Sequence, residues 1–140
     1  MPDLLVERRR TTFTRLEVHE RHGEARAAAE ADDGMIALVH RGVARAAVFQ
    51  CPCGCGEVLV INLDSRTPQA WRHRLRGARL TLMPSVWRDT GCESHFILWE
   101  HSVYWCGPVE NELLERHWPK PLREQLRSWW VEWRLKRNRS

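Results

Sequence analysis

The segment CPCGCGEVLVINL, residues 51–63, decides the fold of this chain. It begins with three closely spaced cysteines, Cys51, Cys53 and Cys55, set among one proline and two glycines. The β-branched apolar run Val58–Leu63 follows them, and another apolar run ends just before them. Proline and glycine favour turns, whereas β-branched residues favour strands. We therefore expect the cysteines to lie at a turn between two strands.

Short apolar runs on both sides of this segment predict further strands. Arg41-Gly42 and the triplet Glu100–Ser102 read as hairpin turns, and Pro84 is expected to end a strand. The runs are Met35–His40, Arg45–Phe49, Trp71–Leu75, Leu80–Met83, Phe96–Trp99 and Val103–Trp105. Such a series of short strands joined by turns indicates a mostly antiparallel β structure.

The cysteine content points to metal binding rather than to disulfides. The chain has five cysteines, an odd number, and three of them crowd together. Zinc prefers four tetrahedral ligands, which are commonly thiolates. The glycines must break the strand for the three clustered thiols to converge on one ion. Cys92 is the natural fourth ligand, with Cys106 and His95 as alternates.

The two ends of the chain differ from this middle part. Residues 1–34 are polar and charged, and they predict a partly ordered N-terminal arm with one short strand around Phe13–His19. Near the C-terminus, Leu122, Leu126 and Trp130 recur every four residues, which predicts a helix packed on a sheet. We therefore expect one α+β domain over residues 35–140, small and mostly antiparallel β, with a zinc knuckle and a C-terminal helix.

Composition excludes several classes of protein. Of the 140 residues, 43% are hydrophobic and 29% are charged, which is typical of one globular domain and not of a disordered chain. No apolar run approaches the roughly 18 residues of a membrane span. The N-terminus lacks the charge order of a secretory signal, so we expect a cytoplasmic location. The net charge of +4 comes from dispersed arginines, which argues against nucleic acid as a partner.

The stretch GCESHF, residues 91–96, offers a candidate pair for nucleophilic catalysis. A serine becomes a nucleophile when a base takes its proton, and here Ser94 is followed directly by His95. Neighbouring strand residues point to opposite faces, however, so His95 need not be the base for Ser94. Other histidines could supply that base: His40, His73 and His101.

Two further residues have both a catalytic and a structural interpretation. Ser85 follows Pro84 and could lie at the edge of a site or simply form a turn. Glu57, directly after the cysteine cluster, could act as general base toward a zinc-bound water. That role needs an open coordination position, so it requires that one of the four thiols is not a ligand. Otherwise Glu57 is an exposed residue at the start of a strand.

Three motifs together resemble a family of uncharacterised bacterial domains. They are CPCGCGE at 51–57, LTLMPSVW at 80–87 and GCESHFILWEHSVYW at 91–105. Members of that family share a CPCGCG-type cluster, a Leu-x-Pro-Ser strand end and a Cys-x-Ser-His strand. They occur in bacterial operons beside ubiquitin-like modifiers and their E1- and E2-like enzymes. The resemblance implies a deubiquitinase-like peptidase. By position it assigns metal binding to Cys51, Cys53, Cys55 and Cys92, and catalysis to Ser94 and His95.

The leading hypothesis for function is therefore a serine-type peptidase with a structural zinc. It would process or remove a ubiquitin-like protein at its C-terminus, with E1- or E2-like enzymes as further partners. The alternatives are a zinc-dependent metallopeptidase that uses Glu57 as base, and a zinc module without catalysis that binds a ubiquitin-like or E2-like partner. Nucleic-acid binding through the arginines is the weakest hypothesis.

Overall fold

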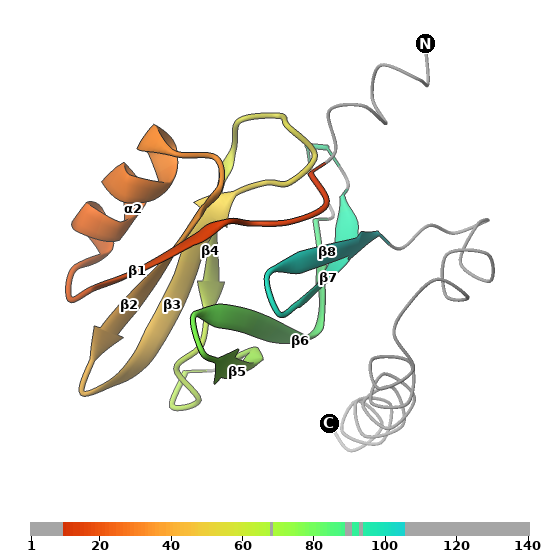
Figure 1. Ribbon diagram of the computed structural model, residues 1–140. Helices are drawn as coiled ribbons and strands as arrows, with labels where there is room; N and C mark the ends of the chain where they lie inside the picture. The colour runs from red at the N-terminus through yellow and green to blue at the C-terminus, as the bar shows by residue number, and fades with distance from the viewer. Residues whose placement is uncertain (1–9, 68, 89–90, 93, 106–140) are drawn as a thin grey trace, which may run out of the picture.

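The computed structural model of the protein describes residues 10–67, 69–88, 91–92 and 94–105. Within these residues the chain forms one helix and two four-stranded sheets, with the helix on the outer side of the first sheet (Figure 1). The first sheet contains β1 (Arg15–His19), β2 (Met35–Arg41), β3 (Val43–Gln50) and β4 (Val58–Asn62), with α2 (His22–Ala31) between β1 and β2. The second sheet contains β5 (Arg72–Arg76), β6 (Arg79–Trp87), β7 (His95–Trp99) and β8 (Ser102–Trp105).

The helix α2 lies in a segment for which the sequence predicted loose structure. Ala25 and Ala29, four residues apart, are fully buried on one face of this helix. Their small side chains let the helix lie close to Ala37 and Val48 on the outer face of the first sheet. β1 pairs in parallel with β2, and parallel neighbours need a crossover connection such as this helix. The N-terminal segment from Arg15 onward is therefore part of the first sheet.

The inner face of the first sheet packs against the second sheet to form the main core. Phe49 of β3 is central, because its ring meets Phe13 and Phe96 edge-on at centroid distances of 5.3 Å and 6.3 Å. Other fully or nearly fully buried members of this core are Ile36, Leu38, Ala47, Ile61, Leu80, Leu82, Val86 and Leu98. The predicted apolar runs thus supply the strands and the core between them.

The described residues confirm a mostly β fold with antiparallel pairing, except for the parallel pair β1–β2. The single helix in this part of the chain, α2, is not long and apolar enough to span a membrane. The predicted C-terminal helix, with Leu122, Leu126 and Trp130, lies outside the described residues, as does Cys106.

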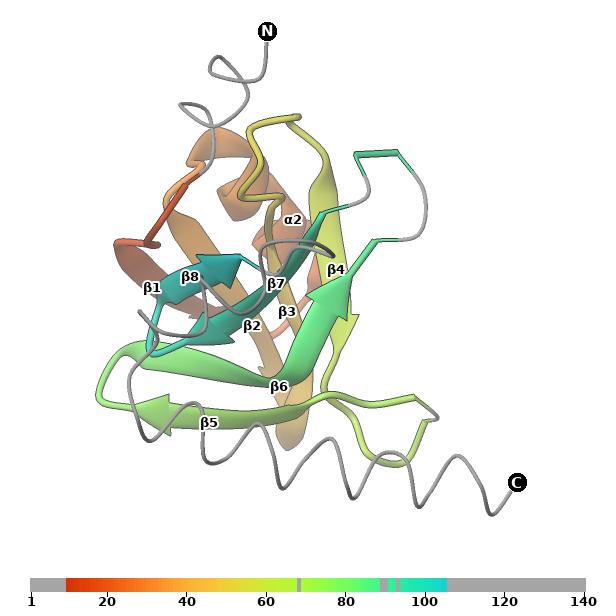
Figure 2. The ribbon, with the colours of Figure 1, turned by 90° about the vertical axis from the view of Figure 1, so that its right-hand side faces the viewer.

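β6 does not end at Pro84, as the sequence predicted, but continues to Trp87. Leu82 pairs with Leu98 and Val86 pairs with Phe96, so four positions along β6 correspond to only two along β7. β6 therefore carries two extra residues between Leu82 and Val86, and Figure 2 shows the strand bending there. Proline has no backbone N–H to donate to a regular ladder, so a proline within a strand is tolerated at an irregularity such as this bulge. The bulge contains Ser85.

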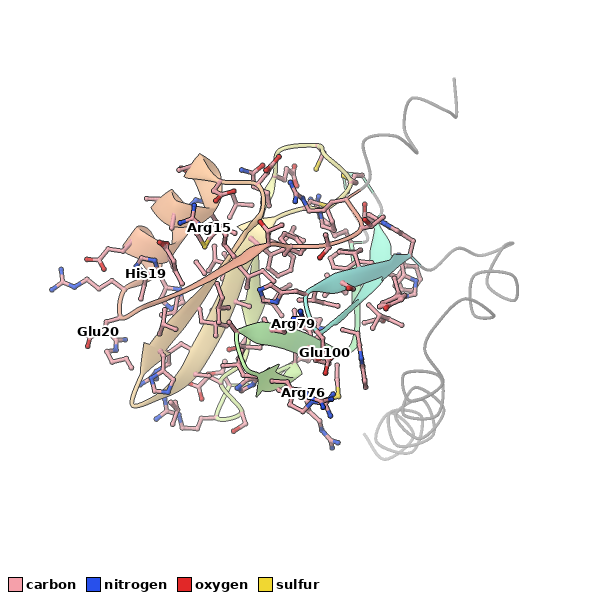
Figure 3. All side chains as sticks on the ribbon, viewed as in Figure 1. Arg15, His19, Glu20, Arg76, Arg79 and Glu100 are labelled. Atoms are coloured by element: carbon pink, nitrogen blue, oxygen red, sulfur yellow. The ribbon has the colours of Figure 1, made fainter. Side chains whose placement is uncertain are left out.

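The turn between β7 and β8 fastens the two sheets to each other. Glu100 and His101 both adopt positive φ angles, 47° and 68°. Nδ1 of the buried His101 accepts the backbone N–H of Leu80 at 2.8 Å, and Nε2 lies 3.3 Å from the carbonyl oxygen of Arg15 on β1. The imidazole is thus the neutral tautomer that carries its proton on Nε2. Figure 3 shows that Glu100 lies beside Arg76, whose Nη1 is 3.3 Å from the Glu100 carboxylate.

His101 should make the free energy of unfolding fall at acid pH. Burial, together with the charge of Arg79, lowers the pKa of His101 below its usual 6.5. The folded protein then binds fewer protons than the unfolded chain, so this stability is present above about pH 6.5 and is lost as the pH falls further. Asparagine tolerates positive φ, so His101→Asn should fold, lose about 1–2 kcal/mol at pH 7.5 and show a weaker pH dependence. Urea unfolding at pH 7.5 and 5.5 measures both effects, and equal pH dependence in the two proteins would contradict this role.

Candidate functional site

Two loops at the same end of the molecule bring four cysteines together (Figure 2). Cys51, Cys53 and Cys55 lie on the loop between β3 and β4, and Cys92 lies on the loop between β6 and β7. Gly54 and Gly56 in the first loop adopt φ angles of 90° and 86°, which favour glycine. These residues break the strand as the sequence predicted, and the three thiols of this loop converge.

The positions of the four sulfurs suit one tetrahedral metal ion. With Zn–S bonds of about 2.3 Å, neighbouring sulfurs of a tetrahedral site lie about 3.8 Å apart. Cys51 Sγ lies 3.4 Å from Cys53 Sγ and 3.6 Å from Cys92 Sγ. All four sulfurs lie within 4.8 Å of one another, so the cluster could hold a metal.

The thiols of this cluster differ in acidity. Burial raises the pKa of Cys53 to about 12. Burial also acts to raise the pKa of Cys92, but hydrogen bonds with Ser94, Cys53 and Cys51 together lower that pKa to about 6. These contacts favour the thiolate form of Cys92, whereas all four sulfurs would be thiolates together only around a cation.

Arg88, directly after β6, lies against both loops. Its Nη1 is 3.0 Å from Cys92 Sγ and 3.6 Å from Cys55 Sγ, and its Nη2 contacts the carboxylate of Glu57. The guanidinium of Arg88 thus contacts two of the sulfurs and the Glu57 carboxylate at once. Glu57, which the sequence offered as a base for zinc-bound water, is engaged in this ion pair.

Ser94, the nucleophile that the sequence favoured, lies on the side of the cysteine cluster. It is buried, and its Oγ is 3.0 Å from Cys92 Sγ. Its carbonyl oxygen accepts the backbone N–H of Arg88 at 2.8 Å. Both contacts tie Ser94 to the residues around the thiols.

His95, the first residue of β7, meets a different serine. Its Nε2 lies 3.0 Å from Oγ of Ser85, in the bulge of β6. Trp71 holds the backbone there, because its indole N–H donates to the carbonyl oxygen of Ser85 at 2.9 Å. Burial lowers the pKa of His95, so its ring is neutral at pH 7 and one nitrogen can accept the proton of the serine. Ser85 and His95 thus form a possible nucleophile–base pair.

The alternation of side chains along a strand separates the two residues that the sequence had paired. Ser94 and His95 are neighbours, so their side chains leave the backbone on opposite sides, one toward Cys92 and the other toward Ser85. The sequence offered Ser85 only as a residue at the edge of a site. The signal that points to it is the preceding Pro84, since a proline within a strand marks a bulge and bulges concentrate near active sites.

A comparison with protein families bears directly on this pair. The model of the family "bacterial ubiquitination-like system serine protease (BubE)" matches residues 22–106, more than half of the chain. The chain belongs to this family. It is a serine protease of a bacterial ubiquitination-like system, as the resemblance of its motifs implied. Comparisons with curated proteins and with solved structures give no match.

The BubE match runs from α2 to the residue after β8, so it covers the cysteine cluster and the Ser85–His95 pair. It also covers the other histidines that the sequence offered as bases. Both ring nitrogens of His101 face backbone groups, of Leu80 and Arg15. His73 is an exposed residue of β5, and partial desolvation together with the charge of His40 lowers its pKa. Among these histidines of the BubE-family chain, the structure brings His95 to a serine hydroxyl.

Removing the indole N–H of Trp71 should impair catalysis more than stability. Trp71→Phe leaves the carbonyl of Ser85 without this donor, which should cost about 1 kcal/mol of unfolding free energy and lower kcat by about tenfold through misplacement of the serine. Trp105→Phe is a matched control, because the Trp105 indole donates to the Arg10 carbonyl at 3.2 Å, outside the Ser85–His95 pair. Urea unfolding and steady-state kinetics compare the two variants. Equal kcat values for both would contradict the role of Trp71.

Proposed function

We propose that this BubE-family protease cleaves at the C-terminus of a ubiquitin-like protein, with Ser85 as nucleophile and His95 as general base. The observation that carries the proposal is the distance of 3.0 Å between Ser85 Oγ and His95 Nε2 in a member of a serine protease family. Ubiquitin-like pathways expose the C-terminal tail of the modifier as the segment that is processed and attached. The E1- and E2-like enzymes of the same pathway are then further partners.

The chemistry follows from the positions of these two side chains. Ser85 Oγ attacks the carbonyl carbon of the scissile bond while His95 Nε2 takes the hydroxyl proton. The same nitrogen then protonates the leaving group as the bond to it breaks, and an ester to Ser85 remains. His95 next takes a proton from a water molecule, which attacks the ester, and the proton returns to Ser85 as the product acid leaves. His95 must begin neutral, which its lowered pKa ensures at pH 7.

The donor set of the cysteine cluster fits a structural zinc ion held by Cys51, Cys53, Cys55 and Cys92. When bound, such an ion supplies a cross-link between the β3–β4 and β6–β7 loops rather than reactive chemistry, because four thiolates fill its coordination positions. Cys92 lies three residues before His95, so its attachment would fix the start of β7. The ion pair of Glu57 with Arg88 also favours the serine mechanism over one in which Glu57 activates a zinc-bound water.

A fluorophosphonate probe tests the assignment of the nucleophile. Such probes form a covalent bond with an activated serine, and peptide mass mapping then identifies the labelled residue. We expect the label on Ser85 and competition by a ubiquitin-like protein with a C-terminal extension. The same extended substrate should lose its extension when the unlabelled protease is added. A label on Ser94 would overturn the choice of Ser85, and cleavage that resists complete labelling would overturn the serine mechanism.

A further inference from the structure

The last part of β6 has a paired strand on one side only. β5 begins at Arg72, which pairs with Met83, whereas β6 continues past Met83 to Trp87 along β7. In the part of the chain that the structure describes, no strand pairs with β6 beyond Met83 on the β5 side. We call residues 84–87 the open edge. Within it the carbonyl oxygen of Ser85 already accepts the indole N–H of Trp71, so the strand-binding groups of the open edge are those of Trp87. Because the open edge contains Ser85, a strand that paired with it would run past the nucleophile.

The hydrogen-bond pattern shows which backbone groups the open edge presents. Arg88 N–H donates to the carbonyl oxygen of Ser94 at 2.8 Å, so these two residues form a hydrogen-bonded pair. In an antiparallel ladder such pairs alternate with pairs that exchange no bond, so the next pair, Trp87 and His95, is of the second kind. The backbone N–H and carbonyl of Trp87 therefore point away from β7, toward the open side.

The same alternation places the side chain of Trp87 next to His95, the proposed general base. Directly opposite residues of a non-hydrogen-bonded pair hold their side chains close together. The rings of Trp87 and His95 are stacked with their centroids 5.2 Å apart and an interplanar angle of 21°. Trp87 is nevertheless 70% exposed, more than the other large hydrophobic residues at the surface of the described structure. An exposed indole beside the base offers an apolar contact for a bound chain.

These observations deepen the proposed function and rest on it. We propose that the open edge binds the extended C-terminal tail of the ubiquitin-like substrate as an added β-strand. The backbone of Trp87 forms the hydrogen bonds, and the Trp87 indole packs on the tail next to His95. An added strand lies about 4.8 Å from its neighbour, which brings a tail carbonyl within reach of Ser85. Only an extended segment can make these bonds, which matches the tail and not the folded body of such a protein.

Proline at position 87 tests the backbone contact. Trp87→Pro removes an N–H that does not bond to β7, whereas Trp87→Ala removes the ring alone and Trp87→Phe keeps an aromatic ring. In the background of Ser85→Ala, which prevents turnover, anisotropy of a labelled tail peptide gives Kd for each variant. We expect Kd near the parent value for Trp87→Phe, a rise for Trp87→Ala, and a further rise of about tenfold for Trp87→Pro, the change expected for one lost hydrogen bond.

Val60 offers a matched control on the other sheet. It is half exposed on the edge strand β4, and Cys51 N–H donates to the Glu57 carbonyl in the same β3–β4 register. By the same alternation, the N–H of Val60 points away from β3. Val60→Pro and Val60→Ala should therefore bind the tail peptide equally well. Thermal unfolding of every variant identifies any that lose the fold.

A second measurement examines the tail itself and needs no variant that could misfold. Tail peptides with a single N-methyl group, moved one residue at a time, should lose binding at alternate positions, because a strand bonds its neighbour through every second residue. Loss of affinity with this period of two, together with the effect of Trp87→Pro, supports the proposal. Equal binding by all methylated peptides overturns it, even if Ser85→Ala is inactive. If binding is lost with this period of two and the Ser85→Ala variant still cleaves the substrate, the tail-binding site is supported and Ser85 is not the nucleophile.

Discussion

Replacement of Ser85 by alanine should lower kcat/KM by at least about 10³-fold for cleavage of a ubiquitin-like protein with a C-terminal extension. The hydroxyl of Ser85 is the group within hydrogen-bond distance of His95 Nε2, and alanine removes the nucleophile without disturbing the bulge backbone. The Trp71 indole can still donate to the carbonyl of residue 85. The mass of the product and the melting temperature, measured on the same preparation, separate lost chemistry from lost fold.

Ser94→Ala is the informative comparison, because Ser94 contacts the cysteine cluster whereas Ser85 contacts His95. Ser94 Oγ contacts Cys92 Sγ, so its removal should raise the pKa of that thiol and weaken metal binding while cleavage continues. His95→Ala should resemble Ser85→Ala. The opposite pattern, with Ser94→Ala inactive and Ser85→Ala active, would place the nucleophile on the side of the cysteine cluster.

Loss of one cysteine of the cluster should have the largest effect on stability. A structural zinc site contributes about 10 kcal/mol or more of binding free energy, which is available only to the folded chain. Cys53→Ser should therefore abolish binding of one zinc equivalent and lower the melting temperature by about 10 °C or more, since a loss of about 1 kcal/mol lowers the melting temperature of a domain of about 150 residues or more by about 2–4 °C. Metal analysis and thermal unfolding, with and without a chelator, measure these effects.

Cys106→Ser serves as the control for that experiment, because Cys106 is the one cysteine of the sequence outside the cluster of four. It should keep one zinc equivalent and the parent melting temperature. Over times too short for unfolding, a chelator should leave the cleavage rate unchanged. Immediate loss of activity would instead indicate that the metal takes part in the reaction.

The features that the sequence predicts well are those with local causes. The cysteine loop depends on the proline and glycines within residues 51–56, which the sequence shows directly. Cys92 was predicted as the fourth ligand because it lies in the GCESHF motif. The strands follow from short apolar runs that the core between the sheets buries. The helix α2 was missed although five of its ten residues are alanine, which favours helix. It lacks the large apolar residues that mark the buried face of a helix, because Ala25 and Ala29 provide that face.

The pairing of Ser85 with His95 could not be predicted from spacing, because it depends on the register between two strands. A ladder counted from the Leu82–Leu98 pair without the two extra residues would place Ser85 directly opposite His95. The bulge instead places Trp87 opposite His95, and Ser85 reaches the His95 ring from within the bulge. Pro84 was interpreted as a strand end, although a proline also fits a bulge. The pairing of β6 with β7 both before and after Pro84 shows that it lies in a bulge. The resemblance to a protease family therefore identified the activity before the geometry indicated its nucleophile.

The order of the strands along the chain also sets when the protease can become active during its own synthesis. The first sheet and α2 lie entirely within residues 15–62, so they are synthesised first, and the inner face of the first sheet is covered only when the second sheet packs on it. Ser85 meets His95 only after β6 and β7 have paired, and β8 and its turn complete that sheet. A nascent chain that has emerged only as far as β5 contains neither Ser85 nor His95 and so cannot contain the pair. The Ser85–His95 pair can therefore form only after the chain through β7 is available to fold.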